Sequence, residues 1–306
     1  MDGVLIIDKP AGMTSHDVVA RVRRIVGERR VGHTGTLDPF ATGILVVLVG
    51  RATRLAQFLG GSVKEYEAVI RLGFSTDTGD VTGKRLTPVQ EKPNPWTNEE
   101  IQDALASLRG EIEQVPPMYS AKKIAGRKLY ELARRGEEVE RKPVRVTIHS
   151  LELAGNVGKI FPQNVDGTTD IQIRVTCSAG TYVRTLAEDV GKRLGVGAHV
   201  VALRRTRAGN FDLKRAKTLE QLEESMRQGS LDDILVSPDL AIEFLPSVSL
   251  TSLEVQRTQQ GLPLKLGSKQ ALREADWVRM RDAAGVLVAV GTYDLEAELV
   301  RPRVVL

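Results

Sequence analysis

The sequence lacks several features that would place it in a specialised class of protein. Its 306 residues include a single cysteine, Cys177, which excludes an intramolecular disulfide and a cluster of thiolate metal ligands. The longest apolar run, Ile44 to Val49, is far shorter than the ~20 residues that cross a bilayer. The first residues have neither the basic segment nor the long apolar segment of a signal peptide. We therefore expect a cytoplasmic protein that does not enter membranes.

Metal and nucleotide patterns are missing as well. The sequence has no phosphate-binding Gly-x-x-x-x-Gly-Lys-Ser/Thr segment, and Gly32-x-x-Gly35 does not extend to a dinucleotide-binding pattern. The four histidines stand far apart with no ligand spacing, so they do not predict a metal site. We therefore expect neither a metal nor a cofactor. The histidines are His16, His33, His149 and His199.

The segment around Asp77 and Asp80 superficially resembles two acidic motifs. It lacks the twelve-residue pattern and terminal Glu of a calcium loop, so a turn is the better interpretation. The triplet Asp77-Thr78-Gly79 also occurs in aspartic proteases, whose chemistry needs two carboxylates that share one proton. A chain with only one such triplet would have to dimerise to bring two carboxylates together, and 306 residues is long for a protease subunit of that kind. A protease therefore remains a distant alternative.

Charge gathers in blocks, although the formal net charge is only +4 and the isoelectric point about 9.2. Residues 174–217 hold ten Lys or Arg against three acids, and residues 120–145 hold nine against four. Residues 21–30 contain five arginines, whereas residues 220–243 contain seven acids and one arginine. Such segregation favours a polyanion-binding surface with a non-binding acidic linker, and solvated helix faces are the alternative interpretation.

Hydrophobic periodicity predicts an α+β protein of about two domains. We expect a mixed or antiparallel sheet with flanking helices, then a small β-rich module, with the linker ending at Leu245-Pro246. The expected strands are 3–8, 44–49, 64–74, 144–153, 171–177 and 200–207, and 64–74 alternates between apolar and polar residues. The expected helices are Thr14 to about Arg30, 52–59, one opening at Thr97, 126–136 and Thr181 to about Leu194. Thr14 and Thr97 are expected to start their helices with capping boxes, and Thr181 is expected to cap the last helix. The expected loops are 31–43, 75–83 and 155–169.

The loop 31–43 is the first candidate site. It contains three glycines, a proline, three threonines and one acid, Asp38. A carboxylate on a rigid loop between a basic helix and a buried strand suits a nucleophile or a base. The alternative is an Asp-Pro turn whose carboxylate bonds nearby backbone amides.

The segment from Gly180 to Arg184 is the second candidate site. Tyr182 and Arg184 lie near the start of an expected helix, where they can stack on a base and pair with a carboxylate or phosphate. A core tyrosine and a surface arginine are the alternative, and Tyr66 on its strand has the same alternative. Cys177, in an alternating strand, is expected to be a buried structural thiol.

Five segments of the sequence, in this order, carry a resemblance to a known family: Asp8–Ser15, Gly32–Gly43, Lys64-Glu65-Tyr66, Cys177–Arg184 and Leu203–Thr206. They resemble, respectively, the N-terminal, catalytic, tyrosine, third and fourth motifs of the bacterial tRNA pseudouridine-55 synthases, the TruB family. The resemblance covers roughly residues 1–211 with all motifs in order, and residues 246–306 are a weaker match to a PUA-type RNA-binding module. Phe40 stands where an aliphatic residue is more usual, a mild change.

The resemblance implies isomerisation of uridine to pseudouridine at position 55 in the T-loop of tRNA, without cofactor or metal. The uridine must leave its stack to be reached. The expected partner is the T-arm of tRNA. No protein partner is expected to be required, and the chain is expected to be a monomer because no coiled coil or sustained apolar repeat is visible.

The resemblance also implies roles for individual residues. Asp38 would be the essential carboxylate, either attacking C1′ or assisting glycal formation. Tyr66 would stack on the flipped base and move the C5 proton, although a phenol of pKa ~10 is a weak base. Arg184 would pair with Asp38. Tyr182 and Leu203 would line the pocket. His33 would occupy or support the space that the flipped base vacates, and Lys9 and Pro10 would support the pocket floor.

The expected domains are a catalytic domain at 1–240, with a basic RNA-clamp insertion at about 120–145, and a PUA-like domain at 246–306. A guide-directed archaeal or eukaryotic-type relative is the alternative within the family. The short basic tail and the absence of a long extension favour the stand-alone bacterial form. A non-catalytic RNA-binding or RNA-folding protein is the alternative from another class.

Overall fold

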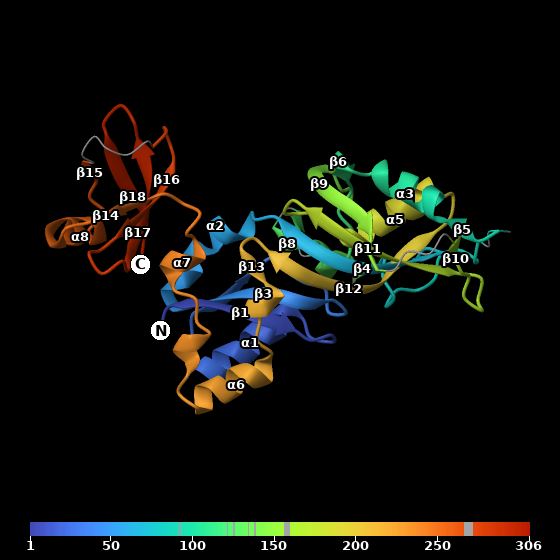
Figure 1. Ribbon diagram of the computed structural model, residues 1–306, viewed down its shortest axis with the longest axis horizontal. Helices are drawn as coiled ribbons and strands as arrows, with labels where there is room; N and C mark the ends of the chain where they lie inside the picture. The colour runs from blue at the N-terminus through green and yellow to red at the C-terminus, as the bar shows by residue number, and fades with distance from the viewer. Residues whose placement is uncertain are drawn as a thin grey trace.

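The computed structural model describes residues 1–90, 92, 94–120, 122–124, 126–133, 135–137, 139–155, 160–265 and 272–306. Within these residues, a nine-stranded sheet runs in the order β1-β3-β12-β4-β11-β9-β6, with β2 pairing β3 and β13 pairing β12 (Figure 1). Its strands are β1 (Gly3–Lys9), β2 (Val31–Thr34), β3 (Thr42–Val49), β4 (Lys64–Leu72), β6 (Gly110–Gln114), β9 (Val144–Leu153), β11 (Thr169–Cys177), β12 (Ala198–Ala208) and β13 (Phe211–Asp212).

Helices flank this sheet, as the α+β prediction requires. They are α1 (Ser15–Val26), α2 (Ala56–Gly60), α3 (Asn98–Ala106), α4 (Leu129–Ala133), α5 (Val183–Arg193), α6 (Leu219–Arg227), α7 (Pro238–Ala241) and α8 (Ser252–Gln259), with the 3-10 turns η1 (Gly50–Leu55), η2 (Leu213–Arg215) and η3 (Leu231–Asp233). No helix in the described ranges is long and apolar enough to cross a membrane.

Capping residues fix the start of α1, and a glycine fixes its end. The Thr14 side chain accepts from the backbone N–H of Asp17, and the Asp17 carboxylate accepts from the backbone N–H of Thr14, which confirms the predicted capping box. The prediction that this helix reaches about Arg30 is wrong. Gly27 adopts a left-handed conformation (φ +66°) that ends the helix at Val26.

The large sheet consists of two halves that meet at a narrow seam. β3 and β12 run parallel and share two residue pairs, Arg204 with Thr42 and Arg205 with Gly43. A Cβ atom on Gly43 would lie 2.2 Å from the backbone oxygen of Arg205, so only glycine allows the two strands to approach this closely. We call this β3–β12 contact the seam. It joins the β1-β3-β2 half to the β12-β4-β11-β9-β6 half.

The two faces of the second half differ sharply. Along β4, alternate side chains from Tyr66 to Leu72 pack into a core shared with α3 and α5, as the alternation predicts. The intervening side chains form cross-strand ion pairs on the opposite face, which we call the charged face. The pairs that include β4 are Arg174–Glu67, Arg71–Asp170 and Arg207–Glu65. On the same face, Arg204 of β12 pairs with Asp8 of β1 across the seam.

The C-terminal strands form a separate five-stranded sheet in the order β14-β16-β17-β18-β15. Figure 1 shows it in red beside α2 and α7. The ring of Trp277 meets that of Phe58 edge-on at 5.0 Å between centroids, so this module packs against the N-terminal half through apolar contacts. Its strands are β14 (Ser247–Ser249), β15 (Leu264–Lys265), β16 (Trp277–Arg281), β17 (Leu287–Asp294) and β18 (Leu299–Val305).

The acidic stretch expected to be a linker is instead structured. Leu219 and Leu222 of α6 are buried against α1, while acidic side chains such as Glu220 and Glu224 stay exposed. A capping box at Thr218 opens the helix. Apolar residues three positions apart make one face of an otherwise acidic segment a packing surface, which the charge count alone does not reveal.

Two expectations near the centre of the chain also need correction. The helix predicted at 126–136 is only α4, preceded by the short hairpin β7 (Lys123–Ile124) and β8 (Arg127–Lys128). The predicted loop 155–169 contains β10 (Ile160–Phe161), which pairs with β5 (Trp96–Thr97). Residues 156–159 of that loop lie outside the described residues.

Candidate active site

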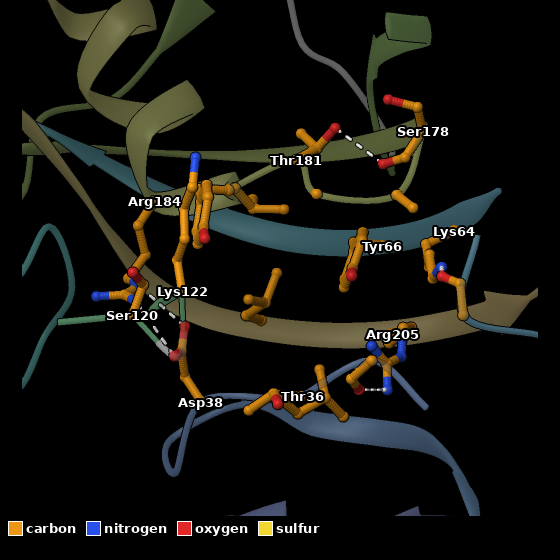
Figure 2. A pocket seen from close by; sticks show the side chains of 18 residues that line it. Thr36, Asp38, Lys64, Tyr66, Ser120, Lys122, Ser178, Thr181, Arg184 and Arg205 are labelled. Carbon is orange, nitrogen blue, oxygen red and sulfur yellow. Dashed lines mark hydrogen bonds and ion pairs between the residues drawn. The ribbon is translucent and has the colours of Figure 1, made fainter. Parts of the chain in front are cut away.

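A cavity of about 230 Å³ lies at the seam, walled by both halves of the sheet (Figure 2). The loop between β2 and β3 forms one wall, and β4, β12 and the start of α5 form the others. The cavity brings together five of the predicted site residues, which come from four separate segments of the chain: Asp38, Tyr66, Tyr182, Arg184 and Leu203.

Asp38 and Arg184 form a two-point ion pair at one end of this cavity. Arg184 Nε lies 2.9 Å from Asp38 Oδ2, and Arg184 Nη2 donates to Asp38 Oδ1 at 3.1 Å. The pairing predicted from the motifs is therefore confirmed. The arginine side chain is 4% exposed, whereas that of Asp38 is 30% exposed. The aspartate is thus the member of the pair that a substrate can reach.

Arg184 is held by three further groups. It donates to the backbone oxygens of Thr78 (2.8 Å) and Tyr119 (2.7 Å), and its Nη1 lies 3.6 Å from Asp80 Oδ2. Asp80 is itself buried and accepts hydrogen bonds from Thr78 and Thr82. The guanidinium is therefore fixed from several directions before any substrate binds.

Burial sets the acidity of the carboxylate that faces the cavity. It raises the pKa of Asp38 above its ordinary value, and the nearby charge of Asp80 raises this pKa further. The positive charge of Arg184 opposes both effects. The arginine therefore favours the ionised form of Asp38 in surroundings that would otherwise protonate it.

The start of α5, which carries Arg184, is not capped by the residue that the sequence predicts. Thr181 does not cap the helix; its hydroxyl donates to the backbone oxygen of Ser178 at 2.9 Å, and Tyr182 occupies the cap position without a side-chain bond. The backbone N–H of Tyr182 instead donates to Gln114 Oε1 at 2.9 Å. A buried side chain from β6 thus holds the residue that precedes Val183 and Arg184.

Tyr66 lies near the middle of the cavity, between the Asp38–Arg184 pair and the side chains of Lys64 and Arg205 (Figure 2). Burial raises the pKa of its phenol, so the hydroxyl is protonated at neutral pH. A protonated aromatic side chain on a rigid strand offers a flat surface for stacking and a hydroxyl for hydrogen bonding.

The backbone of the Asp38 loop is fastened by buried groups of the N-terminal motif. The Ser15 hydroxyl donates to the backbone oxygen of Leu37 at 3.1 Å and accepts from its N–H at 2.9 Å. Lys9 Nζ donates to the backbone oxygens of Met13 (2.7 Å) and Pro39 (3.2 Å). Burial lowers the pKa of Lys9 to about 8.

The expected loop 31–43 is only partly a loop, since β2 and the first residues of β3 lie within it. His33 on β2 is not among the residues that line the cavity. Its ring meets that of His16 edge-on at 5.4 Å between centroids, and burial lowers its pKa to about 4. Pro10 is exposed and also lies outside the cavity lining. The roles assigned to these two residues stay predictions.

Sequence reasoning missed four residues that shape the site: Asp80, Gln114, Lys64 and Arg205. Asp80 was assigned to a turn, which is confirmed, but its contact with Arg184 joins positions far apart in the sequence. Lys64 and Arg205 belong to two of the family motifs, which imply no role for them, and both line the cavity. Among the described residues, no group of three or more His, Cys, Asp or Glu side chains is arranged to hold a metal ion.

The predicted basic insertion lies beside the site. Ser120 and Lys122 line the cavity, and the backbone oxygen of Tyr119 binds Arg184. Arg134, within the predicted clamp helix, lies outside the described residues.

Comparison with known proteins assigns this arrangement to a class of RNA-modifying enzyme. The model of the TruB family pseudouridylate synthase N-terminal domain matches residues 23–183, and that of the tRNA pseudouridylate synthase B C-terminal domain matches residues 184–243. The chain therefore belongs to the TruB family of pseudouridylate synthases, as the motifs predicted.

Curated relatives and solved structures agree with this assignment. The chain is 46% identical over 266 residues to the tRNA pseudouridine synthase B of Bacillus cytotoxicus, covering 87% of this chain and 85% of that protein. It is equally similar to the synthase B of Geobacillus kaustophilus, covering 87% and 92%. A Cbf5-Nop10-Gar1 complex matches with a TM-score of 0.72 and 28% identity, covering 99% of this chain and 84% of that chain.

Proposed function

We propose that this enzyme isomerises uridine 55 in the T-loop of tRNA to pseudouridine, with Asp38 as the essential carboxylate. The observation that carries the proposal is the Asp38–Arg184 pair, which presents a partly exposed carboxylate to a cavity containing Tyr66. Relatives that are 46% identical to the chain carry the name tRNA pseudouridine synthase B, which supports tRNA as the substrate.

The reaction conserves atoms and needs no oxidant or reductant. The bond between N1 of uracil and C1′ of ribose breaks, and a bond between C5 and C1′ forms. One proton leaves C5 and one joins N1. Asp38 acts at C1′, while Arg184 keeps its carboxylate ionised and oriented.

We propose that the target uridine flips out of its stack, and the location of the carboxylate supports this step. Asp38 lies within a cavity, so a base stacked in an RNA helix cannot reach it, and unstacking costs a few kcal/mol. We propose that Tyr66 stacks on the flipped uracil and handles the C5 proton, and that Tyr182 and Leu203 enclose it. Lys9 supports the loop through Pro39, and His33 supports the space that the base leaves.

The stand-alone form is favoured over a guide-directed form. The solved neighbours that are complexes of Cbf5 with other proteins are 26–28% identical to the chain, against 46% for the bacterial relatives. We propose that the enzyme recognises the T-arm as a monomer without a protein partner, and that residues 1–240 and 246–306 act as catalytic and RNA-binding domains.

Tritium release from C5-labelled uridine in an unmodified tRNA transcript tests the proposal. Wild type should release one tritium per tRNA, and Asp38→Asn should release none. A transcript with cytidine at position 55 is the matched substrate control, and it should abolish release by wild type. Release from that transcript would contradict the assigned position. Release by Asp38→Asn at a near-normal rate would remove Asp38 from the chemistry.

A further inference from the structure

Arg205 is a fully buried cation in the wall of the cavity, and its side chain has no role in the reaction proposed above. It is 1% exposed, and its guanidinium carbon lies 6.0 Å from the centroid of the Tyr66 ring. Within the described chain, no carboxylate forms an ion pair with it. Burying an unpaired charge is costly, so such a residue is expected to be satisfied by other polar groups.

Backbone oxygens on the other side of the seam provide these groups. Arg205 Nε donates to the oxygen of Ile44 at 2.6 Å, and Nη2 donates to the oxygen of Gly35 at 2.9 Å. These two residues stand at the two ends of the segment that carries Asp38. One rigid, planar side chain therefore brackets both ends of the catalytic loop.

The backbone of Arg205 also joins the strands that hold the other site residues. Its Cα pairs with Tyr66 on β4 and with Gly43 on β3. Asp38 belongs to one half of the sheet, whereas Tyr66 and Arg184 belong to the other, and the direct strand contact between the halves is limited to two residue pairs. The spacing between Asp38 and Tyr66 therefore depends on how firmly this seam is held.

The neighbouring arginine holds the seam from the opposite face. Arg204 Nη2 lies 2.7 Å from Asp8 Oδ2 on β1, and this side chain is 39% exposed. Consecutive residues on β12 thus reach across the seam on both faces. The exposed contact is screened by water, whereas the buried contact acts directly on the loop of Asp38.

We propose that Arg205 is a positioning residue, which sets the distance between Asp38 and Tyr66 by bracketing the catalytic loop across the seam. This inference rests on the proposed function for the identity of the reaction. Arg205 acts on the loop through two backbone carbonyl groups, and its guanidinium also contacts the Tyr66 side chain, so it positions both groups. A lysine in its place would keep the charge but lose the planar fork that spans two carbonyl groups.

The test compares Arg205→Lys with wild type in single-turnover isomerisation at saturating tRNA. A misplaced catalytic group costs up to ~10²-fold in rate, so we expect a 10- to 100-fold slower reaction. The dissociation constant for tRNA should change by less than about threefold, since phosphate contacts elsewhere dominate affinity. Arg174→Lys, in an exposed ion pair on the charged face, is the matched control and should react at the wild-type rate.

Amide hydrogen exchange gives a second measurement that needs no RNA. The amide of Leu37 donates to Ser15 Oγ at the start of α1, and the amide of Ala41 donates to the backbone oxygen of Asp38 within the loop. Both should exchange faster in Arg205→Lys, while amides within α5 keep their protection. Arg205→Gln provides the same comparison if the lysine variant does not fold.

Three results would overturn the inference. An unchanged rate at saturating tRNA would limit Arg205 to a structural role, and a loss confined to the dissociation constant would make it an RNA contact. Uniformly faster exchange across the protein would indicate general destabilisation. If wild type itself does not isomerise tRNA, the proposed function fails, while faster exchange of Leu37 and Ala41 would still show that Arg205 holds the loop.

Discussion

Two sets of ion pairs, one in the cavity and one on the charged face, show how similar groups acquire different roles. Arg184 is 4% exposed and contacts Asp38 at 2.9 Å, while Arg174 is 55% exposed and contacts Glu67 at 2.8 Å. The distances are nearly equal, so distance does not distinguish the pairs. What differs is that water surrounds the second pair and is largely excluded from the first.

The consequence is visible in the partners of each arginine. Arg184 is also bound by two backbone oxygens and lies near Asp80, so losing one partner leaves a buried charge uncompensated. Arg174 can exchange Glu67 for water at almost no cost. The buried pair is therefore sensitive to small changes, and its substitution should test the comparison most strongly.

The largest effect is expected from Asp38→Asn compared with Glu67→Gln. Each change removes the negative charge of a carboxylate that pairs with an arginine, and it keeps the shape of the substituted side chain. Asp38→Asn should lower the rate of pseudouridine formation by about 10³-fold or more, because the group acting at C1′ is lost. Glu67→Gln should stay within about twofold of wild type. Single-turnover assays measure the rates of both variants, and circular dichroism establishes that both are folded. Similar rates for the two variants would contradict the distinction between the buried and the exposed pair.

Arg184→Lys should have the next largest effect, about 10²-fold on rate. Lysine retains the charge but cannot contact both carboxylate oxygens of Asp38 while also reaching the backbone of Thr78 and Tyr119. The thermal midpoint should also fall. The same exchange at Arg174 should change neither quantity. A wild-type rate for Arg184→Lys would show that a positive charge beside Asp38 is sufficient and that the two-point contact is not required.

Tyr66→Phe separates stacking from proton transfer. It keeps the aromatic ring, so tRNA affinity should be preserved, while turnover should fall by about 10²-fold because the hydroxyl is lost. Tyr66→Leu should weaken tRNA binding as well. Binding titrations and single-turnover rates on both variants make the distinction. A wild-type turnover for Tyr66→Phe together with a loss for Tyr66→Leu would limit Tyr66 to stacking.

The pH dependence of the rate should reflect the buried environment of Asp38. The reaction needs the ionised carboxylate, so the rate should fall as pH falls through the pKa of Asp38. Burial and Asp80 raise this pKa, which places the acid limb above the ordinary aspartate range. Asp80→Asn should move the acid limb to lower pH, because a nearby negative charge is removed. Asp77→Asn, an exposed neighbour in the same turn, should leave it unchanged.

The features that sequence reasoning predicted correctly are those determined by nearby residues. The capping boxes at Thr14 and Thr97 and the alternation along β4 need only short-range patterns, and all three are confirmed. The pairing of Asp38 with Arg184 was implied by a family resemblance. No local pattern could have predicted it, because the two residues are 146 positions apart.

The features that were missed depend on tertiary contacts. β2 contains Gly32 and Thr34, which are typical of a loop, yet its residues form a strand because they pair with β3. The position of Tyr182 at the start of α5 depends on Gln114, which lies 68 residues earlier in the chain. Asp80 reads as a turn residue because its own turn is local, while its contact with Arg184 is made across the fold.

The smallest effect is expected from Arg174→Ala on the charged face. This change breaks the contact with Glu67, but both groups are about half exposed, and such pairs contribute less than about 1 kcal/mol. The thermal midpoint and the rate of isomerisation should both stay close to wild type, also at low salt, where surface pairs are strongest. A rate loss similar to that of Arg184→Lys would show that the charged face takes part in RNA recognition. An unchanged rate would mean that exclusion of water, rather than the pairing of opposite charges, makes the Asp38–Arg184 contact functional.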